Sequence, residues 1–307
     1  MLIQQLINIL YRFPKSKLKT YKRFGGYGNY RKMTDGSKKM KSAVYDLPVS
    51  MAYPDGLPVY FLTGEKYIHQ TLFCINSLLK VSEEKYNFFL VDDGSFNNAI
   101  INLIAEKLPG ATIVTADQIS INLGKYLPGD KFPILNYKRK TYPHIKKLTD
   151  VHTISPLGWK LVLDSDMLFW KEPAAMNNWL KLPNQPIHMV DCEESYGYNT
   201  DLMQEICGGE IPSLLNVGVI GLNSTDLKWE KLEEWIQLLE EKEGTSYYLE
   251  QALTAMIVSG TQPVVLNKND YKVNPILTDL ETKSNILHHY VDLSKEVYYK
   301  KAWKLII

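Results

Sequence analysis

The stretch Leu161-Val162-Leu163-Asp164-Ser165-Asp166-Met167-Leu168-Phe169 sets two carboxylates between two short apolar runs. The first run predicts a buried strand over Lys160–Leu163, after which the chain turns at Asp164. Alternate residues of an extended segment project to the same side, so Asp164 and Asp166 can reach one hard divalent cation, Mg²⁺ or Mn²⁺. Because open α/β sheets bind ligands where their strands end, we predict a metal site at these residues and a ligand contact at Ser165. A solvated turn is the alternative for so short an acidic motif.

The chain before this stretch alternates strand and helix patterns. Short apolar runs at Val59–Thr63, Phe88–Val91 and Thr112–Thr115 are separated by helical periodicity over 68–79 and Ala99–Leu108. This alternation predicts an α/β fold with a mixed, mainly parallel central sheet flanked by helices. Further strands are expected at Ile187–Asp191, Val217–Leu222, Gln262–Leu266 and Ile286–Tyr290, and further helices after Pro143, at Trp229–Glu241 and at Tyr248–Ser259.

Polar residues also follow the first two predicted strands. Leu62-Thr63-Gly64 is a turn of small residues where a nucleotide base can approach the backbone at Thr63. Asp92 and Asp93, after the second strand, can accept hydrogen bonds from ribose hydroxyls or a pyrimidine N–H. The alternative for Asp93 is a turn that caps the next helix.

Histidine can complete a site for a metal that tolerates nitrogen, such as Mn²⁺. His288 and His289 follow the apolar pair Ile286-Leu287 in an expected terminal strand. Since neighbours on a strand face opposite sides, only one of the two histidines can point at the metal.

The charge is balanced overall but not along the chain. The 307 residues carry 35 Lys and Arg against 34 Asp and Glu, which argues against a nucleic-acid binder. Met1–Tyr45, however, holds eleven basic residues and one acidic residue. With apolar positions at helical spacing over 2–13, this predicts a basic amphipathic N-terminal arm over 1–50 and a single domain over 51–307. Two interpretations stay open for the arm: a tail that packs on the domain or is partly disordered, and a contact with an anionic membrane surface.

The three cysteines, at irregular spacing, fit neither a disulfide framework nor a zinc site and favour a reducing compartment. No apolar run approaches the length of a membrane-spanning helix, and the apolar start precedes its basic residues, the reverse of a secretory signal. We therefore expect a cytoplasmic protein, peripheral at most to the inner face of the membrane.

Three sequence blocks follow one another in the second half of the chain. They are Leu163–Leu168, Asn216–Asn223 with Leu227-Lys228-Trp229 after it, and Tyr248–Leu253. In order and spacing these blocks resemble those of GT-A-fold glycosyltransferases, most closely the retaining family-8 group of the galactosyltransferase and glycogenin type. The resemblance covers Leu57–Trp303 and implies a Rossmann-like fold that binds a nucleoside diphosphate-sugar.

The resemblance also implies roles for single residues. Asp164 and Asp166 would bind the metal and the diphosphate, and His289, which an aromatic residue follows, would be the third metal ligand. Asn216 would line the donor or acceptor pocket, and Glu250 and Gln251 would face the transferred sugar. Glu250 stands where the family usually has Asp.

Basic residues are expected at the diphosphate. Lys295 or Lys301 would contact it, although the Gly and Pro that accompany this lysine in the family are missing here. A phosphate-contacting cation also precedes the metal strand in the family. Of the basic residues at that place we expect most on a solvated helix face, and we assign the phosphate contact to Arg139 and Lys146; the full set is Lys138, Arg139, Lys140, Lys146 and Lys147.

Together these residues predict metal-dependent transfer of a sugar, UDP-linked, to an acceptor hydroxyl, with Mn²⁺ or Mg²⁺ as cofactor. A retaining reaction needs no strong base, whereas an inverting one would use Glu250 or Asp191 to deprotonate the acceptor. The acidic and aromatic stretch 191–198 is expected to contact a carbohydrate or glycolipid acceptor, as in surface polysaccharide or glycolipid synthesis. The alternatives are a sugar-nucleotide-binding protein without turnover and a sugar nucleotidyltransferase.

Overall fold

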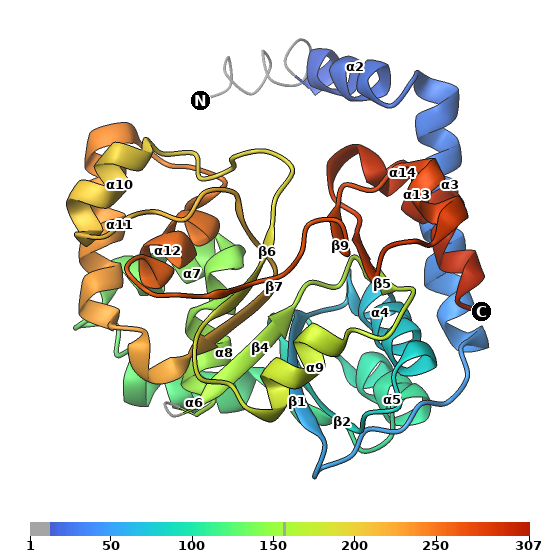
Figure 1. Cartoon of the computed structure of the whole chain (residues 1–307), viewed down its shortest axis with the longest axis horizontal. Coiled ribbons are helices and arrows are strands. Elements are labelled where there is room, and N and C mark those ends of the chain that lie inside the picture. The colour runs from blue at the N-terminus through green and yellow to red at the C-terminus, as the bar shows by residue number, and fades with distance from the viewer. Residues whose placement is uncertain (1–12, 156–157) are drawn as a thin grey trace.

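Ten strands form two sheets in the part of the chain that the computed structural model describes, residues 13–155 and 158–307. They are β1 (Leu57–Thr63), β2 (Tyr86–Asp92), β3 (Thr112–Val114), β4 (Trp159–Leu163), β5 (Met167–Phe169), β6 (Ile187–Val190), β7 (Leu215–Asn223), β8 (Val264–Val265), β9 (Tyr271–Val273) and β10 (Leu287–His289). The central sheet has the order β3-β2-β1-β4-β7-β6-β8, and the small sheet has the order β5-β10-β9 (Figure 1). Within the central sheet only β7 runs antiparallel to its neighbours, β4 and β6. The predicted mixed, mainly parallel sheet is confirmed.

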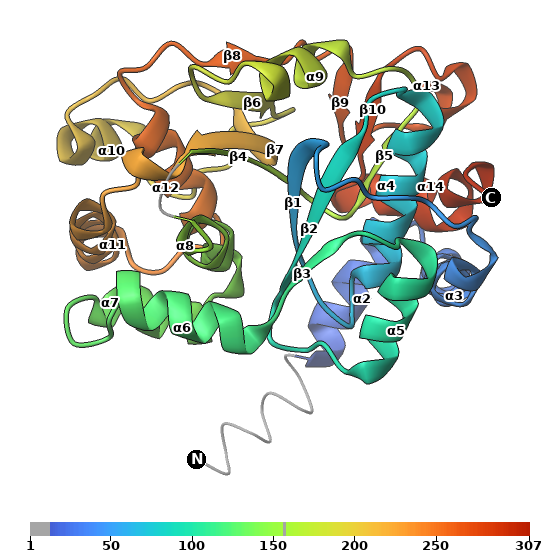
Figure 2. The same cartoon turned by 90° about the horizontal axis from the view of Figure 1, so that it is seen from below.

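Helices cover both faces of the central sheet (Figure 2). They are α2 (Phe13–Arg23), α3 (Tyr27–Ala43), α4 (Ile68–Val81), α5 (Asn98–Lys107), α6 (Ala116–Tyr126), α7 (Pro133–Thr141), α8 (Thr149–Thr153), α9 (Ala174–Lys181), α10 (Thr200–Cys207), α11 (Trp229–Glu243), α12 (Leu249–Val258), α13 (Leu277–Thr282) and α14 (Lys295–Lys300). Short 3₁₀ helices are η2 (Val44–Asp46), η3 (Pro143–Lys147), η4 (Ser224–Asp226), η5 (Asp292–Ser294) and η6 (Ala302–Leu305).

Two hydrophobic cores lie on the two faces of the sheet. Alternate residues of a strand face opposite sides, and β1 shows this: Val59 and Phe61 enter the core that includes α3, α4, α5 and α9, whereas Tyr60 enters the other. That other core includes residues of α6, α7, α8, α10, α11 and α12. Burial on both faces explains why the central strands read as continuous apolar runs.

The basic segment before the metal strand differs from its prediction. A helix is expected after Pro143, but the α-helical part, α7, precedes this proline, and a 3₁₀ helix follows it. Tyr142 is extended, with φ −138° and ψ 81°. Proline disfavours helical backbone in the residue before it, so α7 ends there and the chain restarts in a new direction.

Helices α2 and α3 form most of residues 13–43, and α3 packs on the rest of the molecule. In α3 the buried residues are Met33, Gly36, Met40 and Ala43. The amphipathic helix predicted over 2–13 lies outside the described residues, except Phe13, the first residue of α2. Among residues 13–155 and 158–307 no helix is long and apolar enough to cross a bilayer.

One buried histidine makes the stability of the fold depend on pH. His152 in α8 is 2% exposed, and its Nδ1 lies 2.9 Å from Ser224 Oγ. Burial, together with the nearby charge of Lys160, lowers the pKa of His152 to about 3. Below pH 6.5 the unfolded chain therefore binds a proton that the folded chain does not, and stability is lost as the pH falls. We expect His152 alone to lower the free energy of unfolding by about 2 kcal/mol between pH 8 and pH 5.

Urea unfolding at both pH values measures this effect. The variant His152→Asn removes the titrating group and should lose less stability over the same interval. An equal loss in the variant and the unchanged protein would contradict the assignment.

Candidate metal centre

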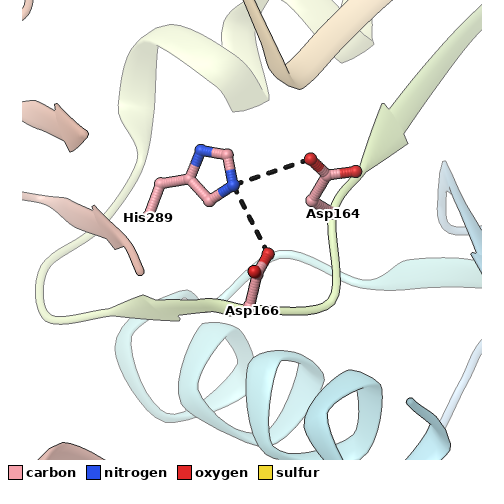
Figure 3. Close-up of side chains that lie close together, drawn as sticks. All are labelled: Asp164, Asp166 and His289. Carbon is pink, nitrogen blue, oxygen red and sulfur yellow. Dashed lines mark ion pairs between the residues drawn. The ribbon is translucent and has the colours of Figure 1, made fainter. Parts of the chain in front are cut away.

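Three side chains converge beyond the end of β4. His289 Nε2 lies 3.6 Å from Asp164 Oδ2 and 3.4 Å from Asp166 Oδ1 (Figure 3). The ligand atoms of this group all lie within 4.8 Å of one another. Strand pairing explains the convergence: β10 pairs antiparallel with β5, which follows Asp166, so His289 stands opposite Met167. The two sheets together thus form a candidate site for a metal ion.

The residues fit a divalent cation. His289 is 3% exposed, yet neither of its ring nitrogens has a hydrogen-bond partner among the residues that the structure describes. Because a buried polar group without a partner is costly, a coordinated cation would account for this imidazole. Two carboxylates and one imidazole suit Mn²⁺ or Mg²⁺.

Gly218 in β7 makes room for the histidine. A Cβ atom at this position would lie 2.5 Å from the His289 ring and 2.9 Å from Asn216 Oδ1. Any larger residue would therefore move the third ligand.

A lysine stands on the far side of each carboxylate. Lys147 Nζ donates to Asp164 Oδ1 at 2.9 Å, and Lys295 Nζ lies 3.5 Å from Asp166 Oδ2. Each aspartate thus presents one oxygen to His289 and the other to a lysine. Two cations that flank a metal site provide positive charge on both sides of a bound anion, as a diphosphate requires.

The charges of these groups stabilise one another. Burial raises the pKa of Asp166, but the adjacent His289 side chain, 3.4 Å away, and the charge of Lys295 outweigh it and lower this pKa to about 2. Burial lowers the pKa of Lys147, but Asp164 and Glu250 outweigh it, so the pKa rises above its usual value. Asp166 is therefore ionised and Lys147 charged at neutral pH.

Glu250 lies next to this centre at the start of α12. It is 5% exposed, and its Oε1 lies 3.8 Å from Lys147 Nζ. Burial raises the pKa of Glu250 to about 7, against the opposing charge of Lys147. Lys147 also donates to the carbonyl oxygen of Val217 at 2.9 Å. Its ammonium group therefore joins β7 and α12 to residues 164–166, the metal loop.

Three other predicted residues form one hydrogen-bonded group. Asp191 Oδ2 accepts hydrogen bonds from Asn216 Nδ2 at 2.9 Å and from Gln251 Nε2 at 3.3 Å. Asn216 Oδ1 accepts from the backbone N–H of Gly218, the residue that faces His289. The network therefore connects Gln251 to the metal centre through the end of β7.

The residues predicted for the nucleoside lie at the ends of β1 and β2. Thr63 Oγ1 is 2.7 Å from Thr71 Oγ1, which is 2.8 Å from Ser165 Oγ, so a hydroxyl chain joins β1 to the metal loop. Asp92 Oδ1 accepts hydrogen bonds from three backbone N–H groups, those of Gly94, Ser95 and Phe96.

The side chain of Lys146, in η3, reaches the turn that holds Asp93. Asp93 Oδ1 accepts from Ser95 N–H at 3.0 Å, and Lys146 Nζ donates to the Asp93 carbonyl oxygen at 2.6 Å. The carboxylate of Asp93 rests against Gly64, where a Cβ would come within 2.1 Å of it.

Other expected residues are engaged elsewhere. Arg139 binds Asp150 through Nε at 2.5 Å and Nη2 at 2.7 Å, and this bidentate pair holds α7 to α8. His288 accepts from Trp170 Nε1 at 2.8 Å and faces away from the metal loop, as strand alternation predicts. Lys301 is exposed, while Lys295 is the lysine beside Asp166.

The stretch 191–198 was predicted to offer aromatic faces to an acceptor, and this is wrong for its tyrosines. Tyr196 and Tyr198 are 1% and 6% exposed because both rings pack in the core beside α10 and α11. Exposed aromatic residues occur instead at Tyr247 and Tyr248, whose rings are 5.3 Å apart before α12.

Comparison with known proteins gives structural likenesses only. No family model and no curated protein matches the chain. A galactosyltransferase, LgtC, solved with donor and acceptor sugar analogs, is similar with a TM-score of 0.49 and 14% identity over 76% of this chain and 87% of that one. Mouse xyloside xylosyltransferase 1 matches with a TM-score of 0.49 and 13% identity over 78% and 97% of the two chains. The glycosyltransferase GlyE of Streptococcus pneumoniae matches with a TM-score of 0.47 and 13% identity over 82% of this chain and 62% of that one.

These solved structures are glycosyltransferases.

Proposed function

We propose that the protein transfers a sugar from a nucleoside diphosphate-sugar to an acceptor hydroxyl. The observation that carries this proposal is the arrangement in which Asp164 and Asp166 share His289 on one side and each face a lysine on the other. A Mn²⁺ or Mg²⁺ ion held by these three ligands would act as a Lewis acid on the leaving diphosphate.

Two lysines would bind the diphosphate beside the metal ligands. Lys147 and Lys295 each direct an ammonium group at a metal-binding carboxylate, so their remaining N–H groups can donate to phosphate oxygens. The hydroxyl chain from Thr63 to Ser165 would contact the nucleoside, which we take to be uridine. So would the turn of Asp92 and Asp93, which Lys146 contacts.

Glu250 and Gln251 would face the transferred sugar, because glycosyl transfer passes through an oxocarbenium-like state that polar and anionic groups stabilise. Asp191 accepts from both Asn216 and Gln251, so we propose that it orients Gln251. Glu250 lies 3.8 Å from the ammonium group of Lys147. Because Asp191 and Glu250 each already face another side chain, we favour a retaining reaction, in which no strong base takes the acceptor proton.

The acceptor is part of the proposal in its chemical class only, a carbohydrate or glycolipid hydroxyl. The anionic membrane surface remains a prediction from the charge of the N-terminal segment, where α2 has Lys22 and Arg23 in its last turn and no acid in its first.

The experiment that tests the function is a donor screen with UDP-, GDP- and CDP-sugars, each with and without Mn²⁺. We expect a rise in melting temperature and slow release of the nucleoside diphosphate with one donor, and both should require the metal ion. Stabilisation without any release, in the presence of a panel of glycan acceptors, would instead support a binding protein. Formation of a nucleotide-sugar from a nucleoside triphosphate would support a nucleotidyltransferase, and no response to any donor would overturn the proposal.

A further inference from the structure

Helix α3 lies directly against α14, the helix that begins at Lys295 (Figure 1). The approach is close at Gly36, which is buried in the contact. A Cβ atom there would lie 2.2 Å from the carbonyl oxygen of Tyr299 and 2.9 Å from its carbonyl carbon. Only glycine allows this contact, because any side chain would meet backbone atoms, which cannot rotate away.

Polar side chains tie the same two segments together. Lys300 Nζ donates to Asn29 Oδ1 at 2.6 Å, and the Asn29 side chain also hydrogen-bonds Glu296. Ser37 hydrogen-bonds Tyr299, and Arg23, before α3, forms an ion pair with Asp292. Residues 23–37 therefore contact Asp292 of η5 and three residues of α14, namely Glu296, Tyr299 and Lys300.

The opposite side of α14 faces the metal centre. Lys295 Nζ lies 3.5 Å from Asp166 Oδ2. The ring of Tyr298 stacks on that of Tyr290 at 4.7 Å, and Tyr290 directly follows the ligand His289. Because α14 has only six residues, its own hydrogen bonds cannot fix its position, and packing must do so.

We infer that α3 positions the lysine of the diphosphate site. Gly36 and Asn29 are positioning residues, which act through α14 on Lys295 and touch no substrate. Residues 27–43 thus support the donor site without contacting the donor, although they precede the whole α/β fold in the sequence. The inference rests on the proposed function, since it assigns Lys295 to a nucleoside diphosphate.

A double-mutant cycle tests the inference, with UDP and Mn²⁺ as the probe and titration calorimetry as the measurement. The four proteins are the unchanged chain, Gly36→Ala, Lys295→Met and the double variant. We expect each single substitution to weaken UDP binding by about tenfold, the effect of one charge-assisted hydrogen bond. The double variant should bind no more weakly than Lys295→Met, because residues that act through one contact are not additive.

Gly28→Ala is the matched control, since Gly28 lies in the same helix, is exposed and has nothing within 4 Å of a Cβ. It should bind UDP as the unchanged protein does. Asn29→Ala serves as a second variant in the cycle if Gly36→Ala fails to fold, as judged by circular dichroism and melting temperature. It should weaken binding only when Lys295 is present.

The outcomes separate the two proposals. Additive losses in the cycle, or tight binding by a folded Gly36→Ala, would overturn the role of α3 and leave the proposed function intact. If the unchanged protein bound none of UDP, GDP and CDP with Mn²⁺, the proposed function would be overturned and this inference with it.

Discussion

Replacing Asp166 by asparagine is expected to reduce metal-dependent release of the nucleoside diphosphate by about a thousandfold or more. The amide keeps the size of the side chain but loses the charge that faces His289 at 3.4 Å and Lys295 at 3.5 Å. It also places an N–H donor where the metal needs an oxygen ligand. Turnover in a Mn²⁺ titration, with free nucleoside diphosphate as the product measured, checks this expectation.

Two comparisons make that result specific. Asp117→Asn, at an exposed position in the first turn of α6, makes the same chemical change far from the proposed ligands and should keep full turnover. Circular dichroism should show the same secondary structure in both variants. Near-normal Mn²⁺-dependent turnover by Asp166→Asn would mean that the metal binds elsewhere.

Local patterns were sufficient for the sheet and for placing the two aspartates of the candidate metal site. The apolar runs of β1, β2 and β4 identify strands because these strands are buried on both faces, and Asp164 and Asp166 follow from the end of β4. Strand alternation limited the histidine to one of two residues. The choice of His289 depended on the family resemblance, since the pairing of β10 with β5 is not visible in the sequence.

Lys147 shows what local patterns could not determine. In the sequence it is the last residue of a basic run that resembles a solvated helix face. The chain restarts at Pro143 as a 3₁₀ helix, whose residues turn by about 120° each instead of about 100°, so neighbouring side chains point in directions that an α-helix would not give. As a result Lys146 reaches the Asp93 carbonyl and Lys147 reaches Asp164.

The buried face of α3 can be found in the sequence, but the many basic residues around it make it hard to recognise. Met33, Gly36, Met40 and Ala43 recur at helical spacing and are the buried residues of the helix. Two of them, Gly36 and Ala43, are small, and glycine disfavours helices. The surrounding basic residues therefore led to the prediction of an N-terminal arm. A close helix contact needs small residues, and for that reason it leaves only a weak hydrophobic signal.

Replacing Lys147 by methionine is expected to lower both stability and turnover. Lys147 is 7% exposed, and its ammonium group lies between Asp164 Oδ1 at 2.9 Å and Glu250 Oε1 at 3.8 Å. Methionine has a similar length but leaves two carboxylates without their cation. We expect the free energy of unfolding to fall by about 3 kcal/mol, as for one partner of a buried ion pair. Turnover should fall about a hundredfold through the loss of a charge beside the leaving diphosphate.

The pH dependence of this loss identifies its cause. Burial already raises the pKa of Glu250 to about 7, and without Lys147 this pKa should rise further. A carboxyl group with a raised pKa in the folded state loses stability as the pH rises above its unfolded pKa, about 4.3. The difference between Lys147→Met and the unchanged protein in urea unfolding should therefore be smaller at pH 5 than at pH 8.

A second substitution separates stability from chemistry. In Lys147→Met with Glu250→Gln the buried charge is gone, so most of the lost stability should return, while turnover should stay low because neither the cation nor the carboxylate is present. The control Lys140→Met removes an exposed lysine of α7 and should change neither property. If Lys147→Met matched Lys140→Met in stability and in turnover, Lys147 would have no role at the metal centre.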